Sequence, residues 1–394
     1  MLKSFRVSNF RGLVNVEFRP VGSNLLIGPN NVGKTSLCAA MRFVSQSASL
    51  ALEQVAQNVV GETWNIANAY VKDNTLQFDM SATLDDGGQP LDFDYTLQVR
   101  VDKSTAGLGV TLRAASEQLR VTGGPFSQTQ LLDCKQGQAQ LLHEEQFLKG
   151  TPYYAKTLSP DDATMLSRLY DLQSNRRANL FKRYLQSWLY FSLNPHAMRS
   201  PAAAEKPGIW PDGSNLTKSM FWLHNERPRV EKRIIDALRS IEPKIDLFTF
   251  AAPDPKSVYL FLEDQEGNRF GTLSISDGTL RYLVFAYLIY GLADGRAGNQ
   301  FSPLVMIEEP EDGLYVGQLR PLFEKIDPSG ASGQFIFTSH SPYIIDLWER
   351  NLAGIHVFKP GKPSSVLVRP DPARIQQLLE HMPLGELHYR EMLS

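Results

Sequence analysis

Residues 28–35, which read G-P-N-N-V-G-K-T, constrain this chain more than any other stretch. They follow the apolar run 25–27 and precede a stretch with helical spacing from 36 to 41. Strand, glycine-bounded loop and helix in this order are typical of a P-loop, whose backbone amides surround a phosphate. A chance match is expected in roughly one chain in a hundred of this length, and the flanking pattern makes chance less probable still.

The predicted loop supplies two kinds of ligand. Glycine accepts backbone angles closed to other residues, so the amides can turn inward, while Lys34 adds a full positive charge. The Thr35 hydroxyl would point at a magnesium ion on the outer phosphates. The residues predicted to bind the nucleotide are Gly28, Pro29, Asn30, Asn31, Val32, Gly33, Lys34, Thr35 and Ser36.

Composition indicates an ordinary soluble protein of more than one lobe. With 394 residues, 42% hydrophobic and 21% charged, the chain exceeds a single core. Its formal charge of -2 excludes a global attraction to nucleic acid, so such a contact needs a local patch. Cys38 and Cys134 form no disulfide or metal pattern, which fits a reducing cytosol. The N-terminus lacks a signal-peptide core and the most apolar stretch, 282–293, is too short to span a membrane, so we expect a cytoplasmic protein.

The remaining pattern predicts an α/β fold. Alternation predicts an N-terminal strand pair, and later an antiparallel meander interrupted near 85–88 and 104–107. From about 128 the spacing looks helical and polar, and a Pro-, Ala- and Gly-rich loop is expected over 195–211. The expected strands are 5–10, 14–18, 25–27, 75–82, 91–101, 109–113, 258–262, 268–273, 304–307 and 334–338. The expected helical segments are 36–43, a polar stretch to 58, 165–172, 215–225, 229–241 and 278–292.

Four carboxylates close the apolar strand 304–307: Glu308, Glu309, Glu311 and Asp312. Adjacent ionised carboxylates repel unless a cation compensates them, and magnesium binds at the mouth of a strand near a P-loop. We therefore assign Glu308 to the metal, through water, and Glu309 to polarising the attacking water. The alternative is an acidic turn that lies in solvent beyond the sheet.

Two further clusters are ambiguous on spacing alone. His340, in T-S-H-S-P after the strand 334–337, reads as a polar residue that ends a strand. Ser276 or Asp277 reads as the N-cap of the helix that follows, whose exposed amides would also receive an anion.

These clusters together resemble the ABC-class ATPases of the RecF and SMC group, and are most similar to its compact AAA-type members. The similarity lies in G-P-N-N-V-G-K-T, S-I-S-D-G-T-L-R, V-M-I-E-E-P-E-D-G-L and T-S-H-S-P, in this order. It covers about 1–100 and 245–394 and includes N-F-R-G at 9–12, L-G-E-L at 384–387 and, inside the insert, D-G-S-N-L at 212–216. The resemblance implies a split ABC-type P-loop ATPase head with a mixed sheet, a β meander and an inserted helical lobe.

The resemblance also implies roles for single residues. Residues 28–35 become the Walker A loop, and Glu308 with Glu309 the Walker B pair, although aspartate is commoner at the first position. His340 becomes the switch histidine, 312–314 the D-loop, and Gln54 and Gln57 are candidates for the Q-loop glutamine. The signature, which reaches the γ-phosphate of ATP on another subunit, becomes Ser276, Asp277, Gly278 and Thr279.

The spacing of the motifs predicts a split head. Lys34 and Glu308 are 274 residues apart, too far for the compact domain of a small GTPase or nucleoside kinase. We expect half-domains over 1–100 and 245–394, with a largely helical lobe over 101–244 because sustained heptads of a coiled coil are missing.

Several functions compete at this point. The first is an ATPase that uses Mg²⁺, closes as a homodimer or higher oligomer over two ATP molecules, and controls a partner such as a nuclease or toxin encoded nearby, in anti-phage defence. The alternative is a RecF-like DNA clamp in repair, in which ATP binding matters more than turnover. A plain P-loop phosphotransferase is the third. A nuclease-like match at Asp254 and Glu263 has Gln265 in place of a catalytic lysine, so a hairpin strand is the favoured interpretation there.

Positive charge is concentrated between 166 and 240, with 13 Lys and Arg against 6 Asp and Glu. It is either a solvated face whose charges pair with acids elsewhere in the fold, or a surface for DNA phosphates or an acidic partner. The residues proposed to contact DNA include Arg176, Arg177, Lys182, Arg183, Arg227, Arg229, Lys232 and Arg233.

Overall fold

The computed structural model describes residues 1–103, 109–149, 153–158, 161–170, 173–200, 208–254, 257–293, 303–326, 329–330, 333–361 and 364–393. The chain forms two compact units. The first contains 1–21, 28–188 and 356–369, and the second contains 22–27, 189–355 and 370–394. The chain passes between them where the strand β3 ends and the glycine-bounded loop begins.

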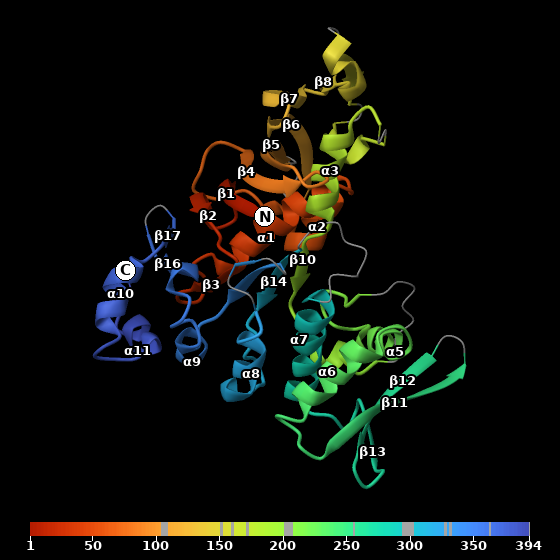
Figure 1. Ribbon diagram of the computed structural model, residues 1–394. Helices are drawn as coiled ribbons and strands as arrows, with labels where there is room; N and C mark the ends of the chain where they lie inside the picture. Colours follow the sequence, from red (N-terminus) through yellow and green to blue (C-terminus); the bar gives the residue numbers. More distant parts are fainter. Residues whose placement is uncertain are drawn as a thin grey trace. The chain divides into compact units, whose positions relative to one another are not determined.

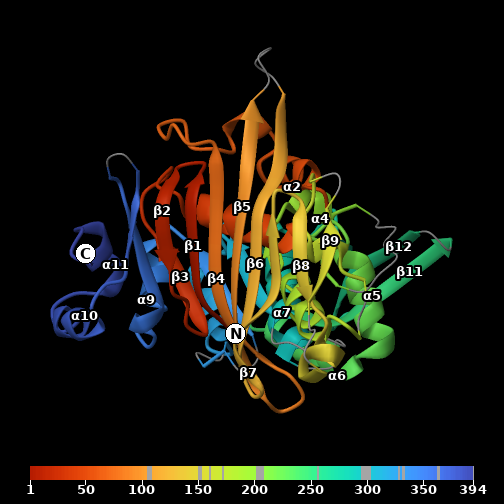
Figure 2. The same cartoon turned by 90° about the horizontal axis from the view of Figure 1, so that it is seen from above.

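The first unit is built on one antiparallel sheet of eight strands, in the order β2-β1-β4-β5-β6-β7-β8-β9. Figure 2 shows its long central strands β4, β5 and β6 side by side. The strands are β1 Leu2–Phe10, β2 Leu13–Phe18, β4 Thr75–Asp85, β5 Pro90–Lys103, β6 Val110–Gly123, β7 Phe126–Lys135, β8 Gln138–Leu142 and β9 Tyr153–Thr157. The predicted N-terminal strand pair and the meander are confirmed; the expected turn at 104–107 lies outside the described residues.

The helical interpretation of the stretch from 128 to 142 is wrong, because this stretch forms β7 and β8. The two leucine pairs of this segment suggested helical spacing, but Leu132 and Leu141 are partners across an antiparallel hairpin. Gln136 and Gly137 turn that hairpin with φ values of 48° and 78°. Polar residues alternate with buried ones along β8, as expected for a sheet with one solvated face.

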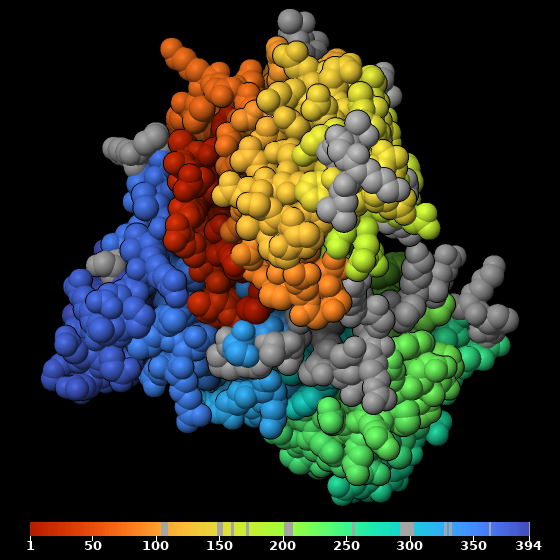
Figure 3. All heavy atoms as spheres, turned by 45° about the horizontal axis from the view of Figure 1, so that its top comes forward, coloured from red at the N-terminus to blue at the C-terminus, as the bar shows by residue number. Residues whose placement is uncertain are grey.

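Three helices cover one face of this sheet: α1 Lys34–Ser47, α2 Leu52–Val60 and α3 Arg176–Gln186. Aromatic contacts fix two of them, since Phe43 of α1 stacks on Phe78 at 5.3 Å and Phe181 of α3 stacks on Phe93 at 5.6 Å between ring centroids. In Figure 3 atoms of the sheet, coloured red to yellow, form a continuous exposed surface. The unit is completed by the hairpin β16 Ile355–Lys359 and β17 Val366–Val368, and by the 3-10 turns η1 Thr63–Asn65, η2 Glu144–Lys149 and η3 Leu166–Arg168.

A helix is expected over 165–172; within its described part, 165–170, the structure has only the single turn η3. Glu117, fully buried on β6, holds its start by accepting hydrogen bonds from the Met165 and Leu166 amides at 2.5 and 3.2 Å. Burial raises the pKa of this carboxyl to about 7, against the opposing effect of the Tyr95 hydroxyl that donates to it at 2.9 Å.

The second unit contains a parallel sheet in the order β10-β14-β15-β3. Its strands are β3 Ser23–Ile27, β10 Leu189–Phe191, β14 Leu304–Glu308 and β15 Gln334–Thr338. Every residue of β3 and β15 is buried, which explains why these strands read as unbroken apolar runs. A small antiparallel sheet, β11 Ile245–Asp254, β12 Ser257–Asp264 and β13 Arg269–Gly271, contains the predicted hairpin; β11 is a strand that the sequence pattern did not predict.

The helices of the second unit include the predicted ones and several short additions (Figure 1). They are α4 Pro195–Met198, α5 Leu216–Glu226, α6 Pro228–Leu238, α7 Asp277–Ala293, α8 Val316–Phe323, α9 Pro342–Asp346, α10 Pro372–Leu378 and α11 Leu384–Tyr389, with the turn η4 Leu352–Gly354. The expected loop over 195–211 begins with α4, and its residues 201–207 lie outside the described part. None of the helices described for this chain has the length and apolar character that a membrane crossing requires.

Candidate nucleotide site

The glycine-bounded loop leaves β3 at Ile27 and enters α1 at Lys34. Gly28, Asn31 and Gly33 have φ values of 142°, 61° and 108°. A Cβ on Gly28 would lie 2.4 Å from the Phe358 carbonyl oxygen, so the chain tolerates only glycine there. The loop therefore has the strained, left-handed turns that bring backbone amides to one side.

The Lys34 ammonium lies over this loop. Its Nζ donates to the carbonyl oxygens of Gly28 and Pro29 at 2.6 and 2.8 Å. Gly33, the N-cap of α1, offers no side chain to the first-turn amides, which leaves the positive end of a 14-residue helix facing the loop. Thr35 is exposed on the first turn, as are Pro29 and two neighbouring asparagines, whereas Val32 is buried.

The acidic strand end lies in the second unit. Glu308 ends β14 and pairs in register with Thr338 of β15, and its Oε2 accepts a hydrogen bond from the Tyr190 hydroxyl at 3.0 Å. Because β3, β14 and β15 are parallel, their carboxyl ends meet at one edge of the sheet. Glu308 thus lies at the edge of the sheet where β3 ends at Ile27.

Glu309 and His340 meet at the same edge. Glu309 has a φ of 43°, and its amide donates to the Thr338 carbonyl oxygen at 3.0 Å. Its Oε1 lies 3.6 Å from His340 Nδ1, with the two side chains 42% and 53% exposed. A left-handed backbone is uncommon at a non-glycine residue, and it sets the direction in which the Glu309 side chain leaves the main chain.

The other two carboxylates have different partners. Glu311 accepts a hydrogen bond from the Ser339 hydroxyl, and its burial raises its pKa, an effect that this bond opposes. Ser339 in turn accepts a bond from the Ser341 amide at 3.0 Å. Glu311 therefore holds the loop that carries His340, a role that the sequence pattern did not reveal. Asp312 instead pairs with Arg281 at 3.4 Å.

Residues 276–279 begin α7, as the cap pattern predicted. Ser276 Oγ accepts a hydrogen bond from the Thr279 amide at 3.1 Å. A Cβ on Gly278 would lie 2.4 Å from the Gly313 carbonyl oxygen. The structure thus packs the start of α7 directly against residues 312–314, with Arg281 of α7 and Asp312 forming a second contact.

The remaining sequence elements of the resemblance are structural supports. Asn215, fully buried, accepts a bond from the Trp210 amide and donates to the Gly208 carbonyl oxygen, both at 2.7 Å. Asn9 accepts a bond from the Asn68 amide at 3.0 Å, next to the turn between β1 and β2. Gly385 of α11 packs against Pro342, where a Cβ would lie 2.4 Å from the Pro342 carbonyl oxygen.

Comparisons with known proteins found two family models and several solved structures that are similar to this chain. A family model described as "AAA ATPase domain" matches residues 1–104, and another, described as "AAA domain, putative AbiEii toxin, Type IV TA system", matches residues 218–346. The head of an SMC protein bound to the C-winged helix domain of ScpA shares the fold, with 11% identity, a TM-score of 0.53 and coverage of 95% of this chain and 99% of that chain. No curated protein sequence matches this chain significantly.

Residues 1–104 and 218–346 thus match models of AAA domains, and the chain as a whole shares the fold of an SMC head. Two further SMC heads were compared. The head domain from Thermotoga maritima is 10% identical, with a TM-score of 0.43 and coverage of 94% of this chain and 99% of that one. An SMC head with an extended coiled coil bound to the C-terminal domain of ScpA, derived from Pyrococcus furiosus, is 10% identical, with a TM-score of 0.47 and coverage of 96% and 98%.

The residue types found in the two units suit the two parts of a magnesium nucleotide. A helix N-terminus, a lysine and loop amides attract phosphate, and a hydroxyl and a carboxylate are the oxygen ligands that Mg²⁺ prefers. Lys34 and Thr35 belong to the first unit, whereas Glu308, Glu309 and His340 belong to the second.

Proposed function

We propose that this chain binds ATP with Mg²⁺ and hydrolyses it to ADP and phosphate. The observation that carries the proposal is the approach of Glu309 to His340, 3.6 Å apart, at the sheet edge where β3 ends. A half-exposed carboxylate beside an imidazole is suited to taking a proton from water.

The proposal assigns a role to each of these residues. Residues 28–36 would hold the phosphates, with Lys34 compensating their charge. Thr35 and Glu308 would hold the metal, the carboxylate through water, as the resemblance implies. Tyr190, bonded to Glu308, fixes one oxygen of that carboxylate. Glu309 accepts the proton of the attacking water, and His340 orients Glu309. Bound Mg²⁺ would neutralise charge that develops on the phosphates.

We propose a homodimer closed by two nucleotides. Residues 276–279, supported by the D-loop 312–314, would reach ATP held by the second copy, as the resemblance implies. We also propose that the protein can form higher oligomers. In addition, it would control a partner effector or nuclease in anti-phage defence. The family model that names a putative AbiEii toxin and the SMC head bound to a domain of ScpA support control of a partner. The half-domains 1–100 and 245–394, separated by the insert 101–244, remain our division of the chain.

Phosphate release by the purified protein tests the reaction. We expect release with ATP and Mg²⁺, and its loss when EDTA removes the metal, because the carboxylates alone cannot neutralise the phosphates. ATP binding with no turnover under any condition would favour the RecF-like clamp. Transfer of the γ-phosphate to an acceptor in place of water would favour the phosphotransferase.

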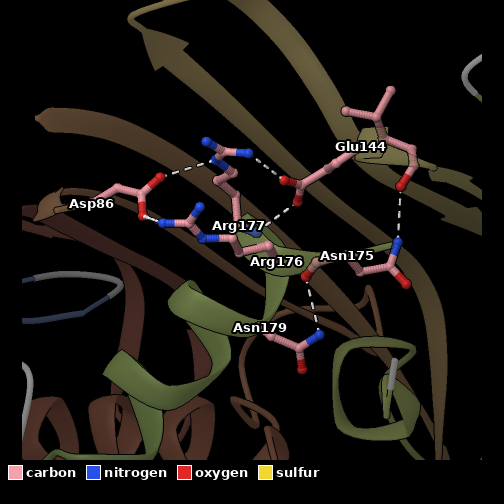
Figure 4. Close-up of polar contacts among 7 residues, drawn as sticks. Asp86, Glu144, Asn175, Arg176, Arg177 and Asn179 are labelled. Atoms are coloured by element: carbon pink, nitrogen blue, oxygen red, sulfur yellow. Dashed lines mark hydrogen bonds and ion pairs between the residues drawn. The ribbon is translucent and has the colours of Figure 1, made fainter. Parts of the chain in front are cut away.

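Some cations of the basic stretch 166–240 are not available to bind DNA. Arg176 and Arg177, at the first turn of α3, pair with Asp86 at 2.5 and 3.1 Å, and Arg177 also pairs with Glu144 at 2.7 Å (Figure 4). Both carboxylates are 5% exposed. These acids offset two cations at the positive end of a helix, so both arginines support the fold of the first unit.

Lys182 is also occupied within the first unit. Its ammonium donates to the Ser167 and Leu169 carbonyl oxygens at 2.7 and 2.9 Å, and burial lowers its pKa. Reversing Arg176, Arg177 and Lys182 would therefore damage the fold and could not report on DNA. Among the described residues of this basic stretch, the exposed cations that remain are Arg183 of α3 and three residues of α6: Arg229, Lys232 and Arg233.

The exposed cations of α6 therefore provide the test of whether the protein binds DNA as a clamp. Changing Arg229, Lys232 and Arg233 to Glu should weaken duplex binding at low salt and lower the log-log salt slope by about 2 to 3, at about 0.9 per phosphate contact. ATP affinity should stay unchanged. The control is Arg320→Glu with Lys325→Glu, two exposed cations in the same unit. If the wild-type protein with ATP shows no salt-sensitive binding, the DNA clamp is excluded and a protein partner is favoured.

A further inference from the structure

One short stretch of the second unit, residues 189–199, contacts two of the proposed catalytic elements. It begins with β10, which pairs with β14 in parallel, and Tyr190 of β10 donates its hydroxyl to Glu308. It ends after α4 with Arg199, which contacts the segment before α7. Neither residue belongs to any motif found in the sequence, and both lie in the inserted part of the chain.

Arg199 holds the segment before α7 through three contacts. Its guanidinium donates to the Ile275 carbonyl oxygen at 2.9 Å and pairs with Asp277 Oδ1 at 2.5 Å. Its own carbonyl oxygen accepts a hydrogen bond from the Thr272 hydroxyl at 3.1 Å. The Arg199 side chain is 18% exposed and the Asp277 side chain 57%. Both acceptors are held by Nη2, whose two N–H groups are fixed in the guanidinium plane, so they set the direction of this segment more strictly than the rotating ammonium of a lysine would.

The short helix α4, which precedes Arg199, is held in place by its own contacts. Met198 is fully buried, and a Cβ on Gly213 would lie 2.7 Å from its Cε. The Asn194 amide donates to the Asp212 carbonyl oxygen at 2.9 Å, and the Asn194 side chain accepts a bond from the His196 amide at 3.1 Å. The loop at 212–216, a sequence element with no assigned role, therefore anchors α4 and places Arg199.

We propose that Arg199 is a positioning residue for the signature segment 274–279. It acts through Ile275 and Asp277 and does not touch nucleotide in the same protomer. By aligning the start of α7, it prepares Ser276, Gly278 and Thr279 to meet the phosphates held by a second copy. This inference rests on the proposed ATPase function, and it links the insert to the catalytic half through the stretch 189–199.

Two arginine variants test the proposal against a matched control. In Arg199→Met the guanidinium is lost but the apolar stem remains, whereas Arg199→Lys keeps the charge without the planar fork. Arg239 provides the control because it makes the same kinds of contact elsewhere in the unit, to the Ile245 carbonyl oxygen at 3.1 Å and to Asp246 Oδ1 at 2.5 Å. Arg239→Met should loosen the start of β11 and leave the signature segment unchanged.

Hydrogen exchange of the amides in 273–280 reports on position without any need for turnover. We expect exchange about tenfold faster in Arg199→Met, less change in Arg199→Lys and none in Arg239→Met. The kcat for ATP should fall about ten- to hundredfold in Arg199→Met, while ATP affinity of the protomer stays at the wild-type value. When Asp277 is already changed to Asn, adding Arg199→Met should lower kcat much less than it does in the wild-type protein. The reason is that Asp277→Asn has already weakened the contact between residues 199 and 277.

The outcomes separate this inference from the proposed function. Unchanged exchange over 273–280 in Arg199→Met overturns the positioning role, whatever the turnover. Faster exchange with wild-type kcat also overturns it, since the contact would then be structural only. If the wild-type protein does not hydrolyse ATP, the proposed function fails, and the exchange measurement still decides whether Arg199 fixes the segment.

Discussion

Glu309→Gln should leave ATP binding intact and lower kcat about 10²- to 10⁴-fold, the usual contribution of a general base. The amide keeps the shape of the carboxylate but cannot take a proton from water. Because nucleotide would then persist in the closed state, the dimer should live longer. Single-turnover phosphate release and size-exclusion chromatography with ATP and Mg²⁺ measure the two effects.

Two comparisons make this result specific to Glu309. Glu324→Gln, at an exposed position of the same unit, should have no effect. Glu308→Gln should instead raise the Mg²⁺ concentration needed for activity, because Glu308 is assigned to the metal. Wild-type turnover in Glu309→Gln would move the catalytic role to Glu308 or to another residue.

Lys34→Ala should abolish tight ATP binding, with an affinity loss of at least about a hundredfold, because the phosphate loop loses its full positive charge. Titration with a fluorescent ATP analogue measures it. Since Lys34 Nζ also donates to the Gly28 and Pro29 carbonyl oxygens, thermal unfolding must show that the variant is folded.

Lys34→Arg is the matched variant for this test. It keeps the charge in a larger, planar group, so it should retain more affinity than alanine. An alanine variant that is folded and binds ATP as tightly as the wild type would refute the assignment of residues 28–36 to the nucleotide.

Short-range chemistry explains what could be predicted from the sequence. The loop at Gly28 and Gly33 follows from backbone angles that only glycine adopts cheaply, and the cap of α7 follows from a single serine hydroxyl. Unbroken apolar runs predicted β14 and β15, because strands buried on both faces have no polar side. The acidic cluster at 308–312 could be found in the sequence for the same reason, because it ends the apolar run 304–307 abruptly.

Long-range contacts decided the rest. The leucine pairs of 128–142 fit a helix or a hairpin equally well, and pairing with β6 and β8 selected strands. Residue types alone do not distinguish a cation that faces solvent from one that is paired with an acid. The contact between Arg176 and Asp86, 90 positions away in the sequence, is what indicates that this arginine supports the fold. Likewise, Glu309 and His340 are separated by a strand and a helix in the sequence. They meet because β14 and β15 are parallel neighbours, whose carboxyl ends must share one edge.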